Sequence, residues 1–167
     1  MSGGTAEARR DSSAEGGVGR EELAVGLRAT VTAEVTDADT AAALGSGDVP
    51  VLGTPRLLAL AEAASVAAVA PALLAGQTTV GTEVSLEHSR PAPVGAPVAV
   101  SAELTGIDGH RLTFSFIAYR PRDGGDADEG SDRGASRGEG GAPVIGAGEV
   151  QRVIVDRVAF LATAARF

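Results

Sequence analysis

Apolar and polar residues alternate along much of the chain, with the two-residue period of strands that bury one face. The alternation is clear on both sides of the dipeptide Asp108-Gly109, which favours a two-residue hairpin turn. An antiparallel hairpin is therefore predicted at this point. Strands are expected at residues 27–35, 79–88, 98–104, 112–118 and 144–155.

A long apolar run without this alternation separates the first predicted strand from the other four. It extends over residues 57–74, is dominated by Ala, and is interrupted by Glu62 and Pro71. Thr54 can cap a helix with its hydroxyl, Pro55 suits the first helical position, and Pro71 ends the run. A helix of about 15 residues is predicted, and its interruptions favour a buried helix over a membrane span.

Two segments lack any hydrophobic period, and both are expected to be disordered. Residues 1–22 form a polar N-terminal tail, and residues 122–141 form an acidic, Gly-rich insert between two strands. Residues 23–167 are expected to form one domain, since a chain of 167 residues with 44% hydrophobic content suits a single core. The order of elements predicts an α+β fold, in which a five-stranded antiparallel sheet wraps around a central helix.

Charge and composition limit the chemistry. Fourteen basic and 22 acidic residues give a formal net charge of −8, which disfavours binding to nucleic acid or to an anionic membrane. The sequence has no cysteine, no histidine cluster with metal spacing and no phosphate-binding glycine loop, so neither a metal nor a cofactor is expected. The polar N terminus lacks the apolar core of a signal peptide, and a cytoplasmic location is expected.

Two charged residues are candidates for a site. Glu62 is the only acid in the predicted helix and borders its apolar face, so it must be hydrogen-bonded, protonated or turned toward a cavity. Its alternative role is a helix acid that reaches solvent or a dimer partner. Arg152, in the last predicted strand, is a surface charge, an ion-pair partner of Glu62, or a group that holds the negative end of a substrate.

His88 ends the second predicted strand, on the side that carries Val80, Thr82, Val84 and Leu86. The parity of the strand turns this histidine toward the helix, as a core residue or as a catalyst.

Smaller residues nearby also have two interpretations each. Thr54 is a helix cap or a functional hydroxyl. Gly81 marks a bulge, or a place where another backbone or a ligand approaches closely.

Taken together, Gly53-Thr54, Glu62, Gly81-Thr82 and His88 resemble the active-site pattern of the fluoroacetyl-CoA thioesterase family, which has the hotdog fold. The resemblance covers about residues 25–120 and 143–158. It implies that Thr54, Glu62 and His88 are catalytic and that Gly81 and Arg152 bind substrate. It also implies a hydrolase that cleaves short-chain acyl-CoA thioesters.

The segment ahead of Thr54 departs from this pattern. The family's namesake has an aromatic lid there, whereas residues 43–51 of this chain contain no aromatic residue, so loose selectivity between short acyl groups is expected. A homodimer is predicted because the sheet would otherwise leave edge strands and apolar surface uncovered. Two alternatives are a non-catalytic acyl-CoA-binding protein and a hotdog hydratase or dehydratase, although the Asp and His pair typical of the latter is not visible.

Overall fold

Five strands and one long helix dominate the computed structural model, which describes residues 21–121 and 141–166. The strands are β1 (Arg28–Glu34), β2 (Gln77–His88), β3 (Pro97–Asp108), β4 (Arg111–Tyr119) and β5 (Val144–Asp156). The α-helices are α1 (Ala41–Leu44), α2 (Thr54–Val69) and α3 (Arg157–Ala164), and two 3-10 turns are η1 (Asp37–Asp39) and η2 (Ala70–Ala72).

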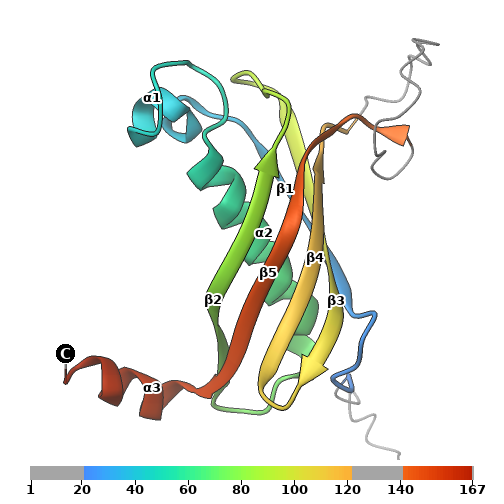
Figure 1. The fold of residues 1–167 in the computed structure, drawn as a ribbon, viewed down its shortest axis with the longest axis vertical. Coiled ribbons are helices and arrows are strands. Elements are labelled where there is room, and N and C mark those ends of the chain that lie inside the picture. The colour runs from blue at the N-terminus through green and yellow to red at the C-terminus, as the bar shows by residue number, and fades with distance from the viewer. Residues whose placement is uncertain (1–20, 122–140, 167) are drawn as a thin grey trace, which may run out of the picture.

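The strands form one antiparallel sheet in the order β1-β3-β4-β5-β2. The sheet curves around α2, which lies across one of its faces, while α3 leaves the end of β5 and points away from the body (Figure 1). The predicted α+β architecture is therefore confirmed. Strands β1 and β2 are the two edges of the sheet, and the free edge of β2 runs beside α2 (Figure 1).

Helix α2 packs on the sheet through a face that recurs every three or four residues, as expected for an amphipathic core helix. A glycine in the sheet lets the helix approach closely: a Cβ atom added at Gly146 of β5 would lie 2.9 Å from a methyl carbon of Leu57. The segment Thr54–Ala72 has the length and apolar character of a membrane span, but 44% of its apolar 18-residue window is buried inside the protein. The buried residues of α2 are Leu57, Leu60, Ala61, Ala64, Ser65, Ala68 and Val69.

The start of α2 differs from the prediction by one residue. Gly53 is the N-cap, Thr54 is the first helical residue, and no side chain of the described residues caps this end of the helix. The expected capping role of Thr54 is therefore wrong. Its hydroxyl is free to bond elsewhere, and that change bears directly on the site.

The side chains of β2 do not alternate uniformly between the face toward α2 and the opposite face. The register of β2 against β5 shifts between Gly81 and Glu83, and such a bulge inverts which side chains face the helix. Thr79 is accordingly buried, whereas Val80 is only partly buried and Thr82 is exposed. The prediction that Val80 and Thr82 share the face of His88 is wrong, because the extra residue of the bulge lies between them and the end of the strand.

Several segments were not anticipated by the hydrophobic pattern. The short helix α1, the turn η1 and the terminal helix α3 were all missed, and η2 prolongs the central helix past Pro71 by one tighter turn. The predicted tail (1–22) and insert (122–141) lie outside the described residues, apart from positions 21, 22 and 141.

Candidate active site

The first residue of α2 and the last residue of β2 meet through their side chains. Oγ1 of Thr54 lies 3.0 Å from Nδ1 of His88. The helix and the strand run in opposite directions, so that the start of one lies beside the end of the other (Figure 1). This contact gives the imidazole a fixed neighbour at one of its two ring nitrogens.

The surroundings of His88 favour its neutral form. Burial lowers the pKa of His88 below the ordinary value of 6.5, and a backbone hydrogen bond at Arg90 opposes this shift in part. The other ring nitrogen, Nε2, is buried and has no hydrogen-bond partner within the described ranges. Because buried polar atoms are nearly always satisfied in native proteins, this ring nitrogen requires a partner, which a water molecule, a substrate or a second chain would supply.

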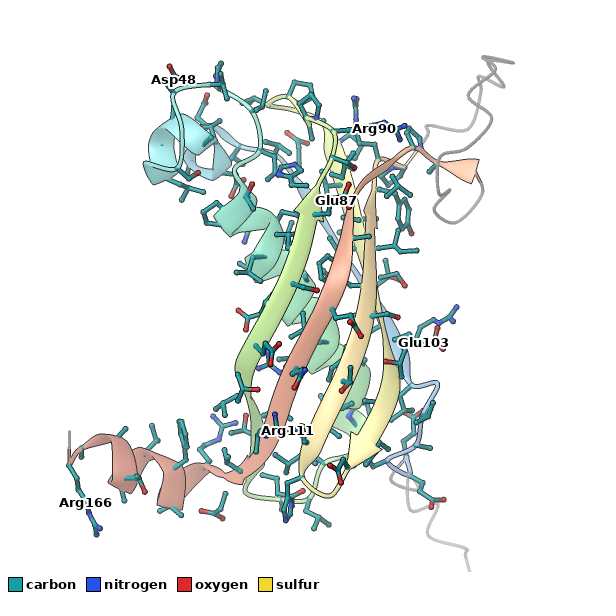
Figure 2. All side chains as sticks on the ribbon, viewed as in Figure 1. Asp48, Glu87, Arg90, Glu103, Arg111 and Arg166 are labelled. Atoms are coloured by element: carbon teal, nitrogen blue, oxygen red, sulfur yellow. The ribbon has the colours of Figure 1, made fainter. Side chains whose placement is uncertain are left out.

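A cavity of about 300 Å³ adjoins this pair. Its apolar wall comes from α1 and the loop that follows, and its polar groups come from Thr54, His88 and the segment after β2, including Arg90. Arg90 lies at the same end of the molecule as Asp48 in the α1 loop (Figure 2). The lining residues are Ala41, Ser46, Gly47, Val49, Val51, Leu52, Thr54, His88, Ser89, Arg90 and Pro91.

The segment that lacks aromatic residues lines the cavity with aliphatic and small side chains. Residues 46–52 supply much of the wall, and none of the lining residues they contribute is aromatic. The sequence already shows that this segment has no aromatic residue. The structure adds that the segment lies in the wall of the cavity.

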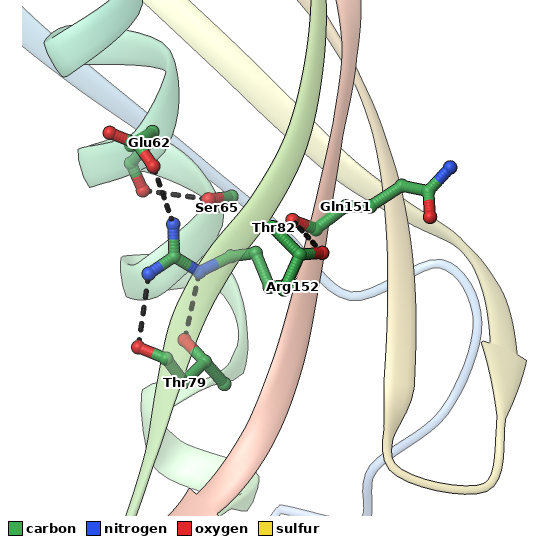
Figure 3. A network of polar contacts seen from close by, with 6 residues as sticks. All are labelled: Glu62, Ser65, Thr79, Thr82, Gln151 and Arg152. Carbon is green, nitrogen blue, oxygen red and sulfur yellow. Dashed lines mark hydrogen bonds and ion pairs between the residues drawn. The ribbon is translucent and has the colours of Figure 1, made fainter. Parts of the chain in front are cut away.

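A second group of polar side chains lies near the middle of α2, the start of β2 and β5, and includes Glu62, Thr79 and Arg152 (Figure 3). Nη1 of Arg152 contacts Oε1 of Glu62 at 3.4 Å, with the arginine side chain 6% exposed and the glutamate side chain 39% exposed. Thr79 accepts two further hydrogen bonds from Arg152, from Nε to its hydroxyl (2.9 Å) and from Nη2 to its carbonyl oxygen (3.1 Å). Of the three roles considered for Arg152, the geometry matches the ion-pair partner of Glu62.

The Arg152 guanidinium keeps its charge despite its burial. Burial lowers the pKa of Arg152, while the carboxylate of Glu62 raises it. Because arginine titrates far above neutrality, the group remains a cation. A buried cation requires such partners, since unpaired burial of a charge is costly.

Gly81 is the residue of β2 that lies directly against the carboxylate. A Cβ atom added there would overlap Oε1 of Glu62 and lie 3.5 Å from Nη1 of Arg152. Gly81 also sits at the bulge, as one of its two interpretations predicted, and the group that approaches it closely is a side chain, not another backbone. A side chain at this position would displace the glutamate.

Within one chain, the predicted residues form two groups. Thr54 and His88 share the cavity, whereas Glu62 lies eight residues along α2, which is about 12 Å of helix, and does not line the cavity. Glu62, Gly81 and Arg152 form the second group. Thr79 was missed from the sequence because uniform alternation assigned it to the face opposite His88.

The fold and the two polar groups define a class of protein, the hotdog-fold proteins of the thioesterase superfamily. Residues 35–126, more than half of the chain, match the model of the FlK family, fluoroacetyl-CoA-specific thioesterase. The chain belongs to that family.

Individual relatives agree with this assignment. The fluoroacetyl-CoA thioesterase of Streptantibioticus cattleyicolor is 37% identical over 69 residues, or 41% of this chain. The match spans half the length of that curated relative.

Solved structures extend the likeness to most of the chain. A solved structure of the fluoroacetyl-CoA thioesterase FlK has a TM-score of 0.70 at 26% identity, covering 87% of this chain and 98% of its own. A FlK variant in complex with fluoroacetate and CoA has a TM-score of 0.66 at 27% identity, with 83% and 99% covered. A thioesterase superfamily member from Thermus thermophilus shares the fold, at 23% identity and a TM-score of 0.68, over 89% of this chain and 93% of its own.

Proposed function

We propose that this protein hydrolyses short-chain acyl-CoA thioesters. The observation that carries the proposal is the His88 imidazole in the cavity wall, neutral through burial, held at Nδ1 by Thr54 and without a partner at Nε2. A neutral imidazole with one oriented and one unpartnered nitrogen suits general base catalysis once a water molecule or substrate reaches the second nitrogen. Family membership and the FlK variant bound to fluoroacetate and CoA support the choice of substrate class.

The reaction can be written from these groups. Nδ1–H of His88 donates to the hydroxyl of Thr54, and Nε2 takes a proton from a water molecule whose oxygen attacks the thioester carbonyl carbon. The resulting oxyanion then collapses and breaks the C–S bond. The imidazolium returns its proton to the thiolate, which leaves as CoA-SH beside the free carboxylic acid. In this reaction the hydroxyl of Thr54 orients His88.

The developing oxyanion needs hydrogen-bond donors, which contribute strongly when they are fixed in advance. The first turn of α2 begins at the cavity, and the N–H groups of a helix start carry partial positive charge. Gly81 does not line the cavity of its own chain, so its backbone N–H is a second candidate donor only if a second copy of the chain brings Gly81 and the nearby Glu62 to this cavity.

A homodimer would unite the two polar groups. The edge of β2 that faces away from β5 pairs with no strand of the described chain, and Val66 of α2 and Val84 of β2 are exposed at 41% and 36%. Antiparallel pairing of two such edges is a common way to protect them. We propose that two copies pair through β2.

The register of this pairing decides whether a composite site forms. If the twofold axis passes between Val84 and Ser85, Gly81 of one chain lies opposite the partner's His88. Glu62, which contacts the region of Gly81, then approaches the histidine of the other chain. The proposed active site would thereby contain Thr54 and His88 from one copy and Glu62 from the other, with Glu62 as nucleophile or as the group that helps to activate water.

Release of free thiol from a panel of acyl-CoA thioesters tests the proposal. We expect hydrolysis of acetyl-CoA and other short acyl-CoAs that is lost in His88→Ala. Binding of acyl-CoA without thiol release would instead favour the non-catalytic binding protein. Reversible hydration of an enoyl-CoA would favour the hydratase.

A further inference from the structure

We propose that Thr79 is a positioning residue for the hydrolysis, acting on Glu62 through Arg152. The inference rests on the proposed function, in which Glu62 takes part. Thr79 is buried, at 7% exposure, and has no contact with the cavity beside His88. Its effect on the reaction is therefore indirect.

Thr79 fixes the plane of the guanidinium. Nε and Nη2 of Arg152, which lie on the same side of the group, donate to the hydroxyl and to the carbonyl oxygen of the same threonine. Two parallel bonds to one residue hold a planar fork in a single orientation. The remaining nitrogen, Nη1, is thereby aimed at Oε1 of Glu62 (Figure 3).

The bulge of β2 makes this arrangement possible. It places Thr79 and Gly81 on the face toward α2, and Gly81 is the residue paired with Arg152 across the strands. Because Gly81 has no side chain, Nη1 and the carboxylate can meet directly above it. Thr79, Gly81 and Arg152 together form a cradle for Glu62, which projects from the adjacent helix.

The cradle holds a carboxylate that is still accessible. The side chain of Glu62 is 39% exposed, whereas that of Arg152 is 6% exposed. Partial exposure spares the carboxylate part of the desolvation cost that a fully buried ion pair carries, and it leaves an oxygen of Glu62 accessible to other groups. A carboxylate that is held by Arg152 and is still partly exposed can contact a substrate, a water molecule or a partner chain.

The hydroxyl of Thr79 can be removed with little change in volume. Thr79→Val abolishes the bond from Nε of Arg152 but leaves the bond to the carbonyl oxygen, while Thr79→Ser keeps both. Thr78→Val is the matched control, since the same substitution then falls on the neighbouring residue of β2. Each variant is compared by melting temperature and by thiol release.

We expect Thr79→Val to lower kcat about 10-fold to 100-fold, the range for a small misplacement of a reacting group, with KM little changed. Thr79→Ser and Thr78→Val should retain kcat within about threefold. In a Glu62→Gln background, Thr79→Val should cause no further loss, because both changes then act on the same group. The inference would be overturned if Thr79→Val caused an equally large loss of kcat in the Glu62→Gln background. It would also be overturned if the wild-type protein hydrolysed thioesters and Thr79→Val alone left kcat unchanged.

A measurement without turnover separates this inference from the proposed function. The ¹³C signal of the Glu62 carboxyl group should shift in Thr79→Val and stay in place in Thr79→Ser. If the wild-type protein hydrolyses no thioester, the proposed function fails, and this signal still decides whether Thr79 controls Glu62. An unshifted signal in Thr79→Val would show that Arg152 holds Glu62 without the threonine hydroxyl.

Discussion

Thr54 and His88, 34 residues apart in the sequence, lie in contact at 3.0 Å between Oγ1 and Nδ1. The contact exists because Gly53, and not Thr54, is the N-cap of α2. A threonine that capped its own helix would direct its hydroxyl to the backbone of the first turn. Here the hydroxyl orients the imidazole, which is the basis of the proposed general base.

His88→Ala should lower thioester hydrolysis by about 100-fold to 10,000-fold, the usual contribution of a positioned acid or base. Circular dichroism should confirm that the variant remains folded. His110→Ala, which changes the only other histidine of the chain, is the control and should leave turnover unchanged. A folded His88→Ala variant with full activity would remove this residue from the mechanism.

Glu62→Gln should reduce turnover nearly as much, because glutamine keeps the volume of the side chain but removes its charge. Thiol release and the melting temperature are measured on the same sample. If the variant lost stability but kept its kcat, Glu62 would be a structural partner of Arg152 alone.

Mixing two inactive variants tests the composite site. Under the proposed pairing, a heterodimer of His88→Ala and Glu62→Gln contains one intact site, which has His88 from one chain and Glu62 from the other. Equal mixing with free subunit exchange should restore about a quarter of wild-type activity. No recovery, despite mixed dimers seen by native mass spectrometry, would place both residues in a site within one chain. A monomer mass by light scattering would contradict the dimer itself.

Acidification should reveal the lowered pKa of His88. Because burial depresses this pKa below 6.5, the imidazole stays neutral in the folded protein at a pH where the unfolded chain already takes up a proton. The acid limb of kcat/KM should therefore have its midpoint below pH 6.5. The contribution of His88 to stability, present above pH 6.5, should be lost as the pH falls through the folded-state pKa. NMR titration of His110→Gln, in which one histidine signal remains, checks the value directly.

Selectivity between small acyl groups should be modest. Among the described residues, the cavity wall contains Ala41, Gly47, Val49 and Val51 but no Phe, Tyr or Trp, and an apolar pocket separates single small groups by only about 1 to 3 kcal/mol. The values of kcat/KM for fluoroacetyl-CoA and acetyl-CoA should therefore differ by about 100-fold or less. A much larger preference for the fluorinated substrate would show that small side chains suffice for selectivity.

Local patterns determined much of the fold. The two-residue alternation, the turn at Asp108-Gly109 and the apolar run ending near Pro71 place all five strands and α2 close to their observed bounds. These signals are strong because each depends on neighbours a few residues away, and a buried face repeats with the period of its own element. The short helix α1 carries no such repeat, since four residues do not complete a pattern.

Only the tertiary structure decided how the candidate residues are grouped. The sequence suggested Thr54, Glu62, His88, Gly81 and Arg152 as one site, but the fold joins Thr54 to His88 and places Glu62 with Gly81 and Arg152. A single extra residue in β2 turned Thr79 toward Arg152. Neither result can be read from spacing along the chain, because a bulge inverts the facing of a strand, and contacts between a helix and a strand depend on how the two elements pack.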